Sequence, residues 1–309
     1  MKFLKKAVPA FFILLLLFAG QVITADEWVR NPVDWLDELE TFVYGQPGSG
    51  SLMERLDRFE AGFIGKNRDG SLVERLKYLD KVVFENQPHD ISLLYKIQAL
   101  EWVIYRRMHT GSLLSRTEQV ETVLFGSASS GSLTKRLERL INQTFPGGSV
   151  RARWTSIPEG VLVKVRLLDS LNSKKNKAGD SFRFEVIETS SYQNAIIFPE
   201  GTLGTGRLQQ VKRPDTLGRD AMLVLDFGAV RTLDGTPVGL FYGAKASELN
   251  SSLQKAVGAS TAGMLAFGPG GILFGLIIKG QEKTIKEGTD FYVQVNEGFR
   301  IYTLAEDRG

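Results

Sequence analysis

The sequence contains few residues of the types that carry acid–base, nucleophilic or metal chemistry. It has two histidines, His89 and His109, and no cysteine among its 309 residues. Neither histidine has a second ligand at a metal spacing such as i, i+4. Both are flanked by loop-forming residues, so we expect them to lie on the surface. The lack of cysteine excludes disulfides, thiolate zinc sites and iron–sulfur ligands, and the sequence indicates no metal site.

Two glycine-rich stretches are the remaining candidates for catalysis or phosphate binding. Residues 126–131 (GSASSG) connect two repeats, and residues 201–206 (GTLGTG) lie between predicted strands. A nucleophile elbow joins a strand to a helix, and a phosphate loop opens a helix and carries a lysine. Neither stretch has this context, so we interpret both as turns, as we do Glu159 and Glu200. The sequence therefore indicates no catalytic residue, no cofactor and no small-molecule substrate.

The first 25 residues have the three parts of a secretory signal. A basic start precedes an apolar run from Ala7 to Gly20, and small residues then lead to Asp26. We expect cleavage between Ala25 and Asp26. An uncleaved anchor is the alternative, but a membrane span needs about 20 apolar residues. Either reading places the protein outside the cytoplasm, in the periplasm, in the outer membrane or on the cell surface.

The charge of the remaining chain is balanced. Of the 38 basic residues, three (Lys2, Lys5 and Lys6) lie in this N-terminal segment, which leaves 35 basic against 35 acidic residues. Phosphate binding requires a surplus of Lys and Arg on one face. A nucleic-acid partner is therefore not expected.

Residues 31–146 form an array of units about 20 residues long. The tripeptide Gly-Ser-Leu recurs at residues 50–52, 70–72, 111–113 and 131–133, and a degenerate unit follows Ser92. Apolar residues within a unit are spaced by four, three and four, which is one face of a helix. The serines at 51, 71, 112 and 132 are predicted N-caps, and those at 51 and 71 match the capping box with Glu54 and Glu74. Helices of this kind must stack to bury their apolar faces.

Charged residues also repeat with the unit. Arginines recur at 55, 75, 116 and 136, and acidic residues recur at 60, 80, 101 and 121. These side chains could form a ligand-binding ladder or ion pairs between stacked units. We favour ion pairs, because a stacking contact requires the same residue in every unit. Trp102 and Tyr105 could bind a glycan, but their place near the apolar face favours the core.

The period of the apolar pattern changes to two after residues 146–149, which read Pro-Gly-Gly-Ser. Strands are predicted around residues 161–167, 182–186, 196–198, 222–227, 238–242 and 291–295. Turns containing Gly160, Gly201, Gly235 and Gly288 separate them. Short strands with such turns favour a barrel or a sandwich. We predict an α + β protein: a signal (1–25), a helical repeat domain (26–148) and a β-barrel-like domain (149–309).

The order of motifs in the second domain resembles a known family. The segments are IPEGVLVKVRLLDSLNS, IIFPEGTLGTGRLQQV, LVLDFGAVRTLDGTPVGL, a Gly-rich apolar insert and TIKEGTDFYVQV. Together they resemble the C-terminal barrel domain of the type IV secretion outer-membrane core component. The resemblance implies a barrel with an insert that forms a membrane-facing hairpin. The signal, the preceding repeats and the lack of a proline-rich stretch depart from that family, so membership of a secretion machine does not carry over.

The insert, residues 256–278, contains no charged residue. Residues 268–271 (GPGG) should break a helix, so we expect two short arms joined by a turn. Small residues four apart permit close backbone contact. We therefore predict membrane or oligomer contact through glycines of the insert, and a hairpin buried on the barrel or against the repeats is an equal alternative. The contact residues we expect are Gly258, Gly263, Gly268, Gly271 and Gly275.

Two classes of function follow from these features. The first is a non-enzymatic envelope protein whose partner is another envelope protein, a membrane surface or a second copy of itself. The second is a secreted cell-wall hydrolase with the repeats as a targeting module. The residue types at hand favour the first class.

Overall fold

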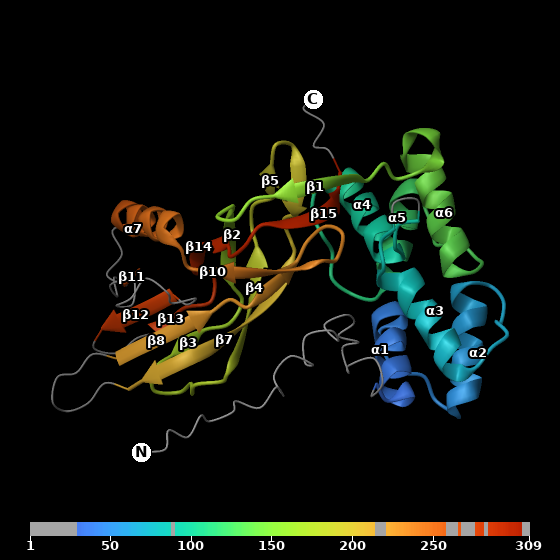
Figure 1. Ribbon diagram of the computed structural model, residues 1–309, viewed down its shortest axis with the longest axis horizontal. Coiled ribbons are helices and arrows are strands. Elements are labelled where there is room, and N and C mark those ends of the chain that lie inside the picture. The colour runs from blue at the N-terminus through green and yellow to red at the C-terminus, as the bar shows by residue number, and fades with distance from the viewer. Residues whose placement is uncertain are drawn as a thin grey trace, which may run out of the picture.

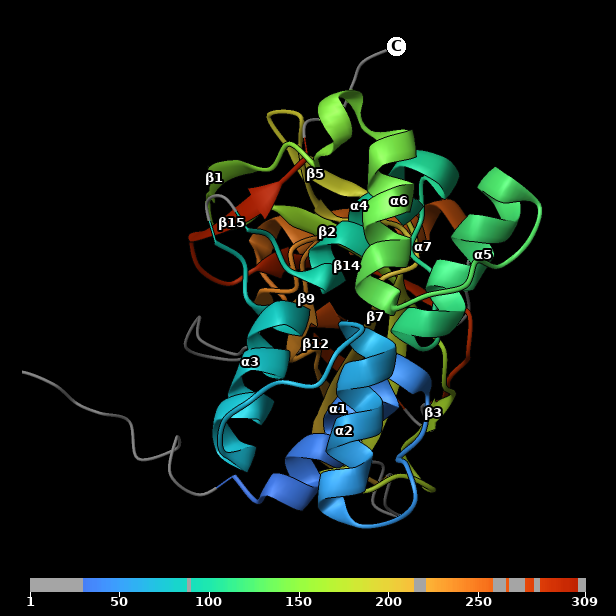
Figure 2. The same cartoon turned by 90° about the vertical axis from the view of Figure 1, so that its right-hand side faces the viewer.

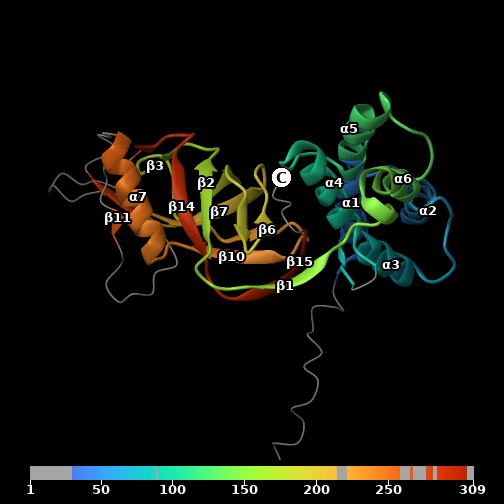
Figure 3. The same cartoon turned by 90° about the horizontal axis from the view of Figure 1, so that it is seen from above.

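The computed structural model describes residues 30–87, 90–213, 221–257, 265–266, 276–280 and 284–304, with the backbone alone over 252–280. An array of helices comes first and a β-barrel follows, which confirms the predicted fold class (Figure 1). The array lies at one end of the long axis, and helix α7 (Ala244–Val257) lies at the other (Figures 1 and 3).

The array has six helices. They are α1 (Pro32–Tyr44), α2 (Leu52–Phe63), α3 (Leu72–Phe84), α4 (Leu93–Tyr105), α5 (Leu113–Phe125) and α6 (Leu133–Thr144). Four of them (α2, α3, α5 and α6) begin directly after their predicted caps. Ser51, Ser71 and Ser112 accept a backbone N–H with their hydroxyls, and the two predicted capping boxes are present. Ser132 stands at the N-cap of α6 but makes no such bond. Its hydroxyl lies 3.5 Å from that of Thr134.

The predicted apolar face of each helix is buried. Leu56 and Leu76, in α2 and α3, are fully buried in one cluster that runs through all six helices. Helix α4 starts after Ser92, so the degenerate unit is a full member of the array. Trp102 is 5% exposed and belongs to the core, as expected. The array is therefore held by a continuous core, because no single amphipathic helix could bury its own face.

The second domain is built around a closed barrel of six strands. Its strands are β2 (Leu162–Leu167), β4 (Ser181–Val186), β7 (Leu203–Lys212), β9 (Ala229–Arg231), β10 (Pro237–Phe241) and β14 (Asp290–Val295). They follow one another in the order β7-β4-β2-β14-β10-β9, and β9 closes the ring on β7 where Gly204 pairs with Val230. Every pairing is antiparallel. Alternate residues of β4 point into the barrel core, where Phe182, Phe184 and Val186 are buried.

Strand β7 corrects the prediction that residues 201–206 are turns throughout. Gly204 and Gly206 lie inside this ten-residue strand, which the sequence pattern did not predict. A Cβ on Gly204 would lie 2.3 Å from Cζ of Phe184, and one on Gly206 would lie 2.3 Å from Cζ of Phe182. The two glycines are thus required by the phenyl rings that fill the barrel.

The end of β7 carries strands that extend beyond the barrel. Residues 207–212 pair with β8 (Ala221–Asp226), β8 pairs with β12 (Leu276–Gly280), and β12 pairs with β11 (Leu265–Ala266). Helix α7, which the sequence analysis did not predict, packs beside β14. There the side-chain amide of Asn250 bonds both the C=O and the N–H of Tyr292, each at 2.8 Å.

Short pairs of strands complete the domain. They are β1 (Arg153–Ile157) with β15 (Phe299–Thr303), β3 (Leu171–Asn172) with β13 (Thr284–Ile285), and β5 (Ser190–Tyr192) with β6 (Ala195–Phe198). The β1–β15 ribbon brings the chain from the array into the barrel domain (Figure 1).

Two tight turns of the barrel domain hold the helical array. In the first turn, the C=O of Glu200 accepts the N–H of Met108 at 2.7 Å. In the second, the C=O of Asp234 accepts the side-chain amide of Asn86 at 2.7 Å. Between them lies an apolar cluster shared by both domains, made of Tyr95, Ala99, Trp102, Met108, Ile196, Leu233 and Leu304. Both turns were predicted, but their role in joining the domains was not.

We predict that Gly201→Ala destabilises the protein more than Gly288→Ala does. Both glycines have a left-handed backbone, with φ of +86° and +83°, so an alanine would suffer similar backbone strain at either position. At Gly201 the new Cβ would also lie 2.5 Å from the carbonyl oxygen of Met108, whereas no described residue lies within 4 Å of the Cβ position at Gly288. We expect an additional loss of about 1–3 kcal/mol for Gly201→Ala in urea unfolding. Equal losses would show that this turn does not hold the array.

Candidate functional site

The repeated charges of the array form a ladder of buried ion pairs. Each arginine pairs with the glutamate 15 residues before it: Arg55 with Glu40, Arg75 with Glu60, Arg116 with Glu101 and Arg136 with Glu121. The last three pairs are separated by 2.6–2.8 Å. All eight residues are at most 8% exposed. The ion-pairing prediction is confirmed, and no charge of these pairs faces outward as a ligand-binding ladder would require.

Each of these glutamates also binds a loop. The carboxylate accepts the backbone N–H of the residue eight positions further on, and these residues are Gly48, Arg68, His109 and Ser129. One carboxylate therefore joins its own helix, the following loop and the next helix. A buried carboxylate with this many donors is fully satisfied, which is the condition for placing a charge in a core.

The ladder has one interruption, between α3 and α4. Asp80 stands at the glutamate position of α3, but it accepts the indole N–H of Trp35 at 2.8 Å and pairs with Arg30. Lys96 stands at the arginine position of α4 and lies 4.0 Å from Asp90. The prediction that Asp80 pairs with the next unit is therefore wrong. The reason is an extra residue here, because Ser71 and Ser92 are 21 apart where the other caps are 20 apart.

The electrostatics of the ladder follow from this geometry. Burial alone would raise the pKa of Glu121, but the hydrogen bonds from Arg136 and Ser129 and the Arg136 charge outweigh it and lower that pKa. The hydrogen bond to Glu60 is the largest cause that raises the pKa of Arg75. Burial, followed by the charge of Glu40, raises the pKa of Tyr44 to about 12. Glu121 and Arg75 thus stay ionised at neutral pH and Tyr44 stays neutral, so none of these three groups is poised to exchange a proton there.

A groove of about 710 Å³ lies between the array and the barrel. Phe42, Phe84 and Leu94 line it from the array, and Leu203 and Arg231 line it from the barrel. Leu203 is 49% exposed. The groove combines apolar walls with charged side chains at its rim, a composition typical of a surface that binds another chain.

His109 lies at this groove, half-buried against the ring of Tyr105, with ring centroids 4.4 Å apart. It is thus a loop residue as predicted, but half-buried rather than fully exposed, because the α4–α5 loop lies against the barrel turn at Gly201. Its Nδ1 and the Oε1 of Gln98 are buried without a hydrogen-bond partner among the described residues. His89 lies outside the described residues.

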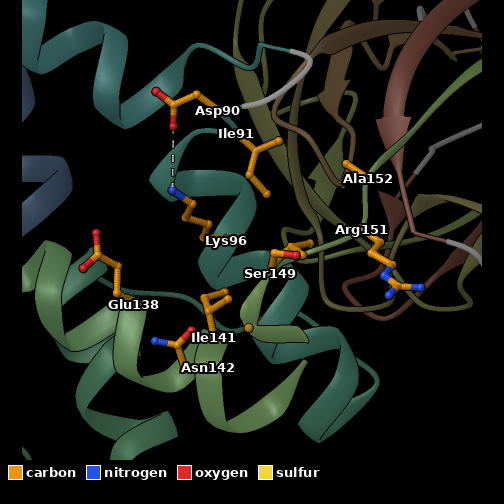
Figure 4. A pocket seen from close by; sticks show the side chains of 11 residues that line it. Asp90, Ile91, Lys96, Glu138, Ile141, Asn142, Ser149, Arg151 and Ala152 are labelled. Atoms are coloured by element: carbon orange, nitrogen blue, oxygen red, sulfur yellow. Dashed lines mark ion pairs between the residues drawn. The ribbon is translucent and has the colours of Figure 1, made fainter. Parts of the chain in front are cut away.

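A second groove, of about 650 Å³, lies where the chain leaves the array. It is formed by the start of α4, by α6 and by residues 148–152 (Figure 4). Figure 4 shows Lys96 and Asp90 pointing toward each other, and Glu138 and Asn142 extending from α6. The lining contains both signs of charge in similar number, so this groove has no preference for an anion or a cation.

The remaining expectations from the sequence concern metals, membrane spans and the insert. Within the described ranges, no group of three or more His, Cys, Asp or Glu residues is arranged to hold a metal ion. Among the helices described, none is both long and apolar enough to cross a bilayer. The predicted cleavage residues, Ala25 and Asp26, lie outside the described residues. The same is true of Gly258, Gly263, Gly268, Gly271 and Gly275, so these predictions remain predictions.

Comparison with known proteins gives distant similarity to solved structures alone. No protein-family model matches the chain, and no curated protein matches it. Among solved structures, the chain is similar to ComB10 of the Com type IV secretion system of Helicobacter pylori, with 14% identity and a TM-score of 0.26. The alignment covers 46% of this chain and 88% of that one. A similarity this weak supports no conclusion about function.

We predict that Glu60→Gln destabilises the array far more than Asp57→Asn does. Both carboxylates contact Arg75, at 2.8 and 2.5 Å, but the side chain of Glu60 is fully buried and that of Asp57 is 46% exposed. Removing the buried partner should cost about 3 kcal/mol, because it leaves a buried charge poorly paired. Removing the exposed partner should cost less than about 1 kcal/mol. Thermal unfolding measures both, and similar costs would contradict the ladder as a source of stability.

The lowered pKa of Glu121 predicts a loss of stability in acid. A carboxyl group whose pKa is lower in the folded state stabilises the fold above its unfolded pKa, near 4.3. That contribution disappears as the pH falls through the lower, folded pKa. We expect Glu121→Gln to flatten the decline in unfolding free energy below about pH 4.3. An unchanged decline would assign acid sensitivity to other groups.

Proposed function

We propose that the protein is a non-enzymatic interaction protein of the bacterial cell envelope. The observation that carries the proposal is where its exposed apolar side chains lie. Seven of the nine large apolar residues that are exposed in the described chain lie on the helical array, and these are Val33, Met53, Val73, Val103, Val123, Leu124 and Phe125. Val123, Leu124 and Phe125 adjoin one another at the end of α5, and an exposed apolar patch marks contact with another protein or a membrane.

The use of the array's charges supports the same role. The buried acids and arginines of the repeats are engaged with each other and with the loops, as described above. The array therefore serves as a rigid support, and it offers its outer surface and the groove at Leu203 to a partner. Stacked helical repeats commonly bind other proteins in this way.

Export is proposed from residues 1–25, with cleavage between Ala25 and Asp26. The mature chain would then consist of the helical domain (26–148) and the barrel domain (149–309). Its partner is another envelope protein, a membrane surface or a second copy of the chain.

The insert, residues 256–278, is proposed to associate with a membrane or with a second insert. Support comes from the pairing of β8, β12 and β11, which carries the chain away from the six-stranded ring. The segment between β11 and β12 contains no charged residue and four glycines, Gly268, Gly270, Gly271 and Gly275. Close backbone contact is the arrangement in which glycine is favourable.

We predict that replacing residues 267–275 with a short Gly-Ser turn releases the protein from the membrane or oligomeric pool. Strands β11 and β12 are kept, so the barrel should remain folded, which circular dichroism checks. The matched control replaces residues 214–220, which connect β7 and β8, in the same way and should not change fractionation. Fractionation that is unchanged by the first replacement would contradict the role of the insert. Clearing of peptidoglycan in a zymogram of the unaltered protein would instead support the hydrolase alternative.

A further inference from the structure

Two helices of the array end on the beginning of another helix. Gly45, directly after α1, sits on Ser112, the N-cap of α5, and a Cβ on Gly45 would lie 3.6 Å from Cβ of Ser112. Gly65, after α2, sits on Ser132, the N-cap of α6, and the corresponding distance is 3.3 Å. In both cases glycine and serine are 67 positions apart (45 to 112 and 65 to 132). The same contact is thus made twice, each time four helices further along.

This contact covers the helix that receives it. Leu113 and Leu133, the first residues of α5 and α6, are at most 2% exposed. The equivalent start of α3 receives no such contact. There Ser71 is exposed, Leu72 is half-buried, and Val73 is 44% exposed. The start of α3, like that of α2 where Met53 is 46% exposed, is therefore a receiving end without an occupant in the described chain.

The C-terminal end of α5 is the opposite case, because it contacts the start of no other described helix, unlike the ends of α1 and α2. Gly126 has the same left-handed backbone as Gly45, with φ of +82° and +93°, but no described residue lies within 4 Å of its Cβ position. Val123, Leu124 and Phe125 are 58%, 37% and 40% exposed. Leu124 holds the position, twelve residues after the N-cap, at which Val43 and Phe63 are fully buried in α1 and α2. Figure 2 shows α5 at the outer side of the array.

We propose that the end of α5 docks on the start of α3 in a second copy of the chain. Within the chain, the end of one helix contacts the start of the helix four places later. For α5 this would be a ninth helix. Since each array has six helices, the ninth corresponds to α3 of a following copy. A helix C-terminus carries partial negative charge and an N-terminus partial positive charge, so the two ends attract each other. The contact joins different surfaces of the two copies, and such heterologous contacts build open chains unless they close into a ring.

The size of the two ends predicts a weak, reversible contact. The exposed parts of Val73, Val123, Leu124 and Phe125 offer on the order of 300 Å² of apolar surface, whereas stable interfaces exceed about 1,000 Å² in total. Association should therefore depend on protein concentration. The inference rests on the interaction role proposed above, but it depends on neither export nor the insert.

Sedimentation velocity over a concentration series tests this docking. We expect the mean mass of the purified protein to rise with concentration, and we expect Leu124→Glu and Val73→Lys each to shift the rise to at least tenfold higher concentration. The double variant places opposite charges at the two ends and should recover part of the association. The matched control is Val103→Glu, on α4. This valine is also exposed (38%), but it belongs neither to the end of α5 nor to the start of α3. It should associate like the unaltered protein, and all variants should keep its helical circular dichroism.

Three outcomes would overturn the docking. They are a monomer at every concentration, association that persists in Leu124→Glu, and equal loss in Val103→Glu. The protein with residues 267–275 replaced separates this inference from the proposed role of the insert. If the replacement abolishes association and Leu124→Glu does not, the insert is the contact, and the interaction role stands while the docking fails.

Discussion

A buried glutamate with fixed partners is the constraint on which the array depends. Its carboxylate accepts the N–H of the residue eight positions on and pairs with the arginine 15 positions on, so both the loop and the next helix are held at set distances along the chain. Ion pairs in a core stabilise little in net terms, because desolvation offsets the attraction, but a mispaired alternative is costly. The ladder therefore specifies how each helix packs against the next one, while the apolar cluster supplies most of the favourable free energy of folding. A unit with one residue too many cannot keep both spacings, and the α3–α4 step shows the result.

The interruption of the ladder divides the array into two sets of three helices and coincides with the attachment of the barrel. Asn86, in the α3–α4 connection, donates to the turn at Asp234, and α4 supplies Tyr95 and Trp102 to the shared apolar cluster. At the next connection Met108 donates to the turn at Glu200. Helix α4, which has no ladder pair to the helix before it, is thus the one that packs on the second domain. Loss of one repeated contact leaves room for an unrelated one, which is how a repeat array can carry a globular domain at its middle.

The sequence predicts those features that depend on spacing along the chain. Caps, apolar faces, ion pairs and the change of period at residues 146–149 are all local patterns, and the helices and the barrel follow from them. It does not reveal features that depend on distant neighbours. Gly204 reads as a turn residue until the ring of Phe184 is known to occupy the place of its Cβ. His109 reads as a surface residue because nothing near it in sequence indicates that a barrel turn covers its loop. A turn that binds another domain looks the same in sequence as a turn that faces water.

The two ends of the ladder show which interactions remain for contact with other molecules. In the first helix, Trp35 stands at the arginine position, and no earlier helix of the array could supply a glutamate for it. In the last helix, Ile141 stands at the glutamate position, and no later helix of the array could supply an arginine. The ladder is thus closed within the chain and leaves no unpaired charge of its own at either end. The helix ends are not closed in the same way, since the start of α3 and the end of α5 present exposed apolar side chains. Further contacts of the array therefore do not draw on the repeated buried charges, because those charges are already satisfied by the fold itself.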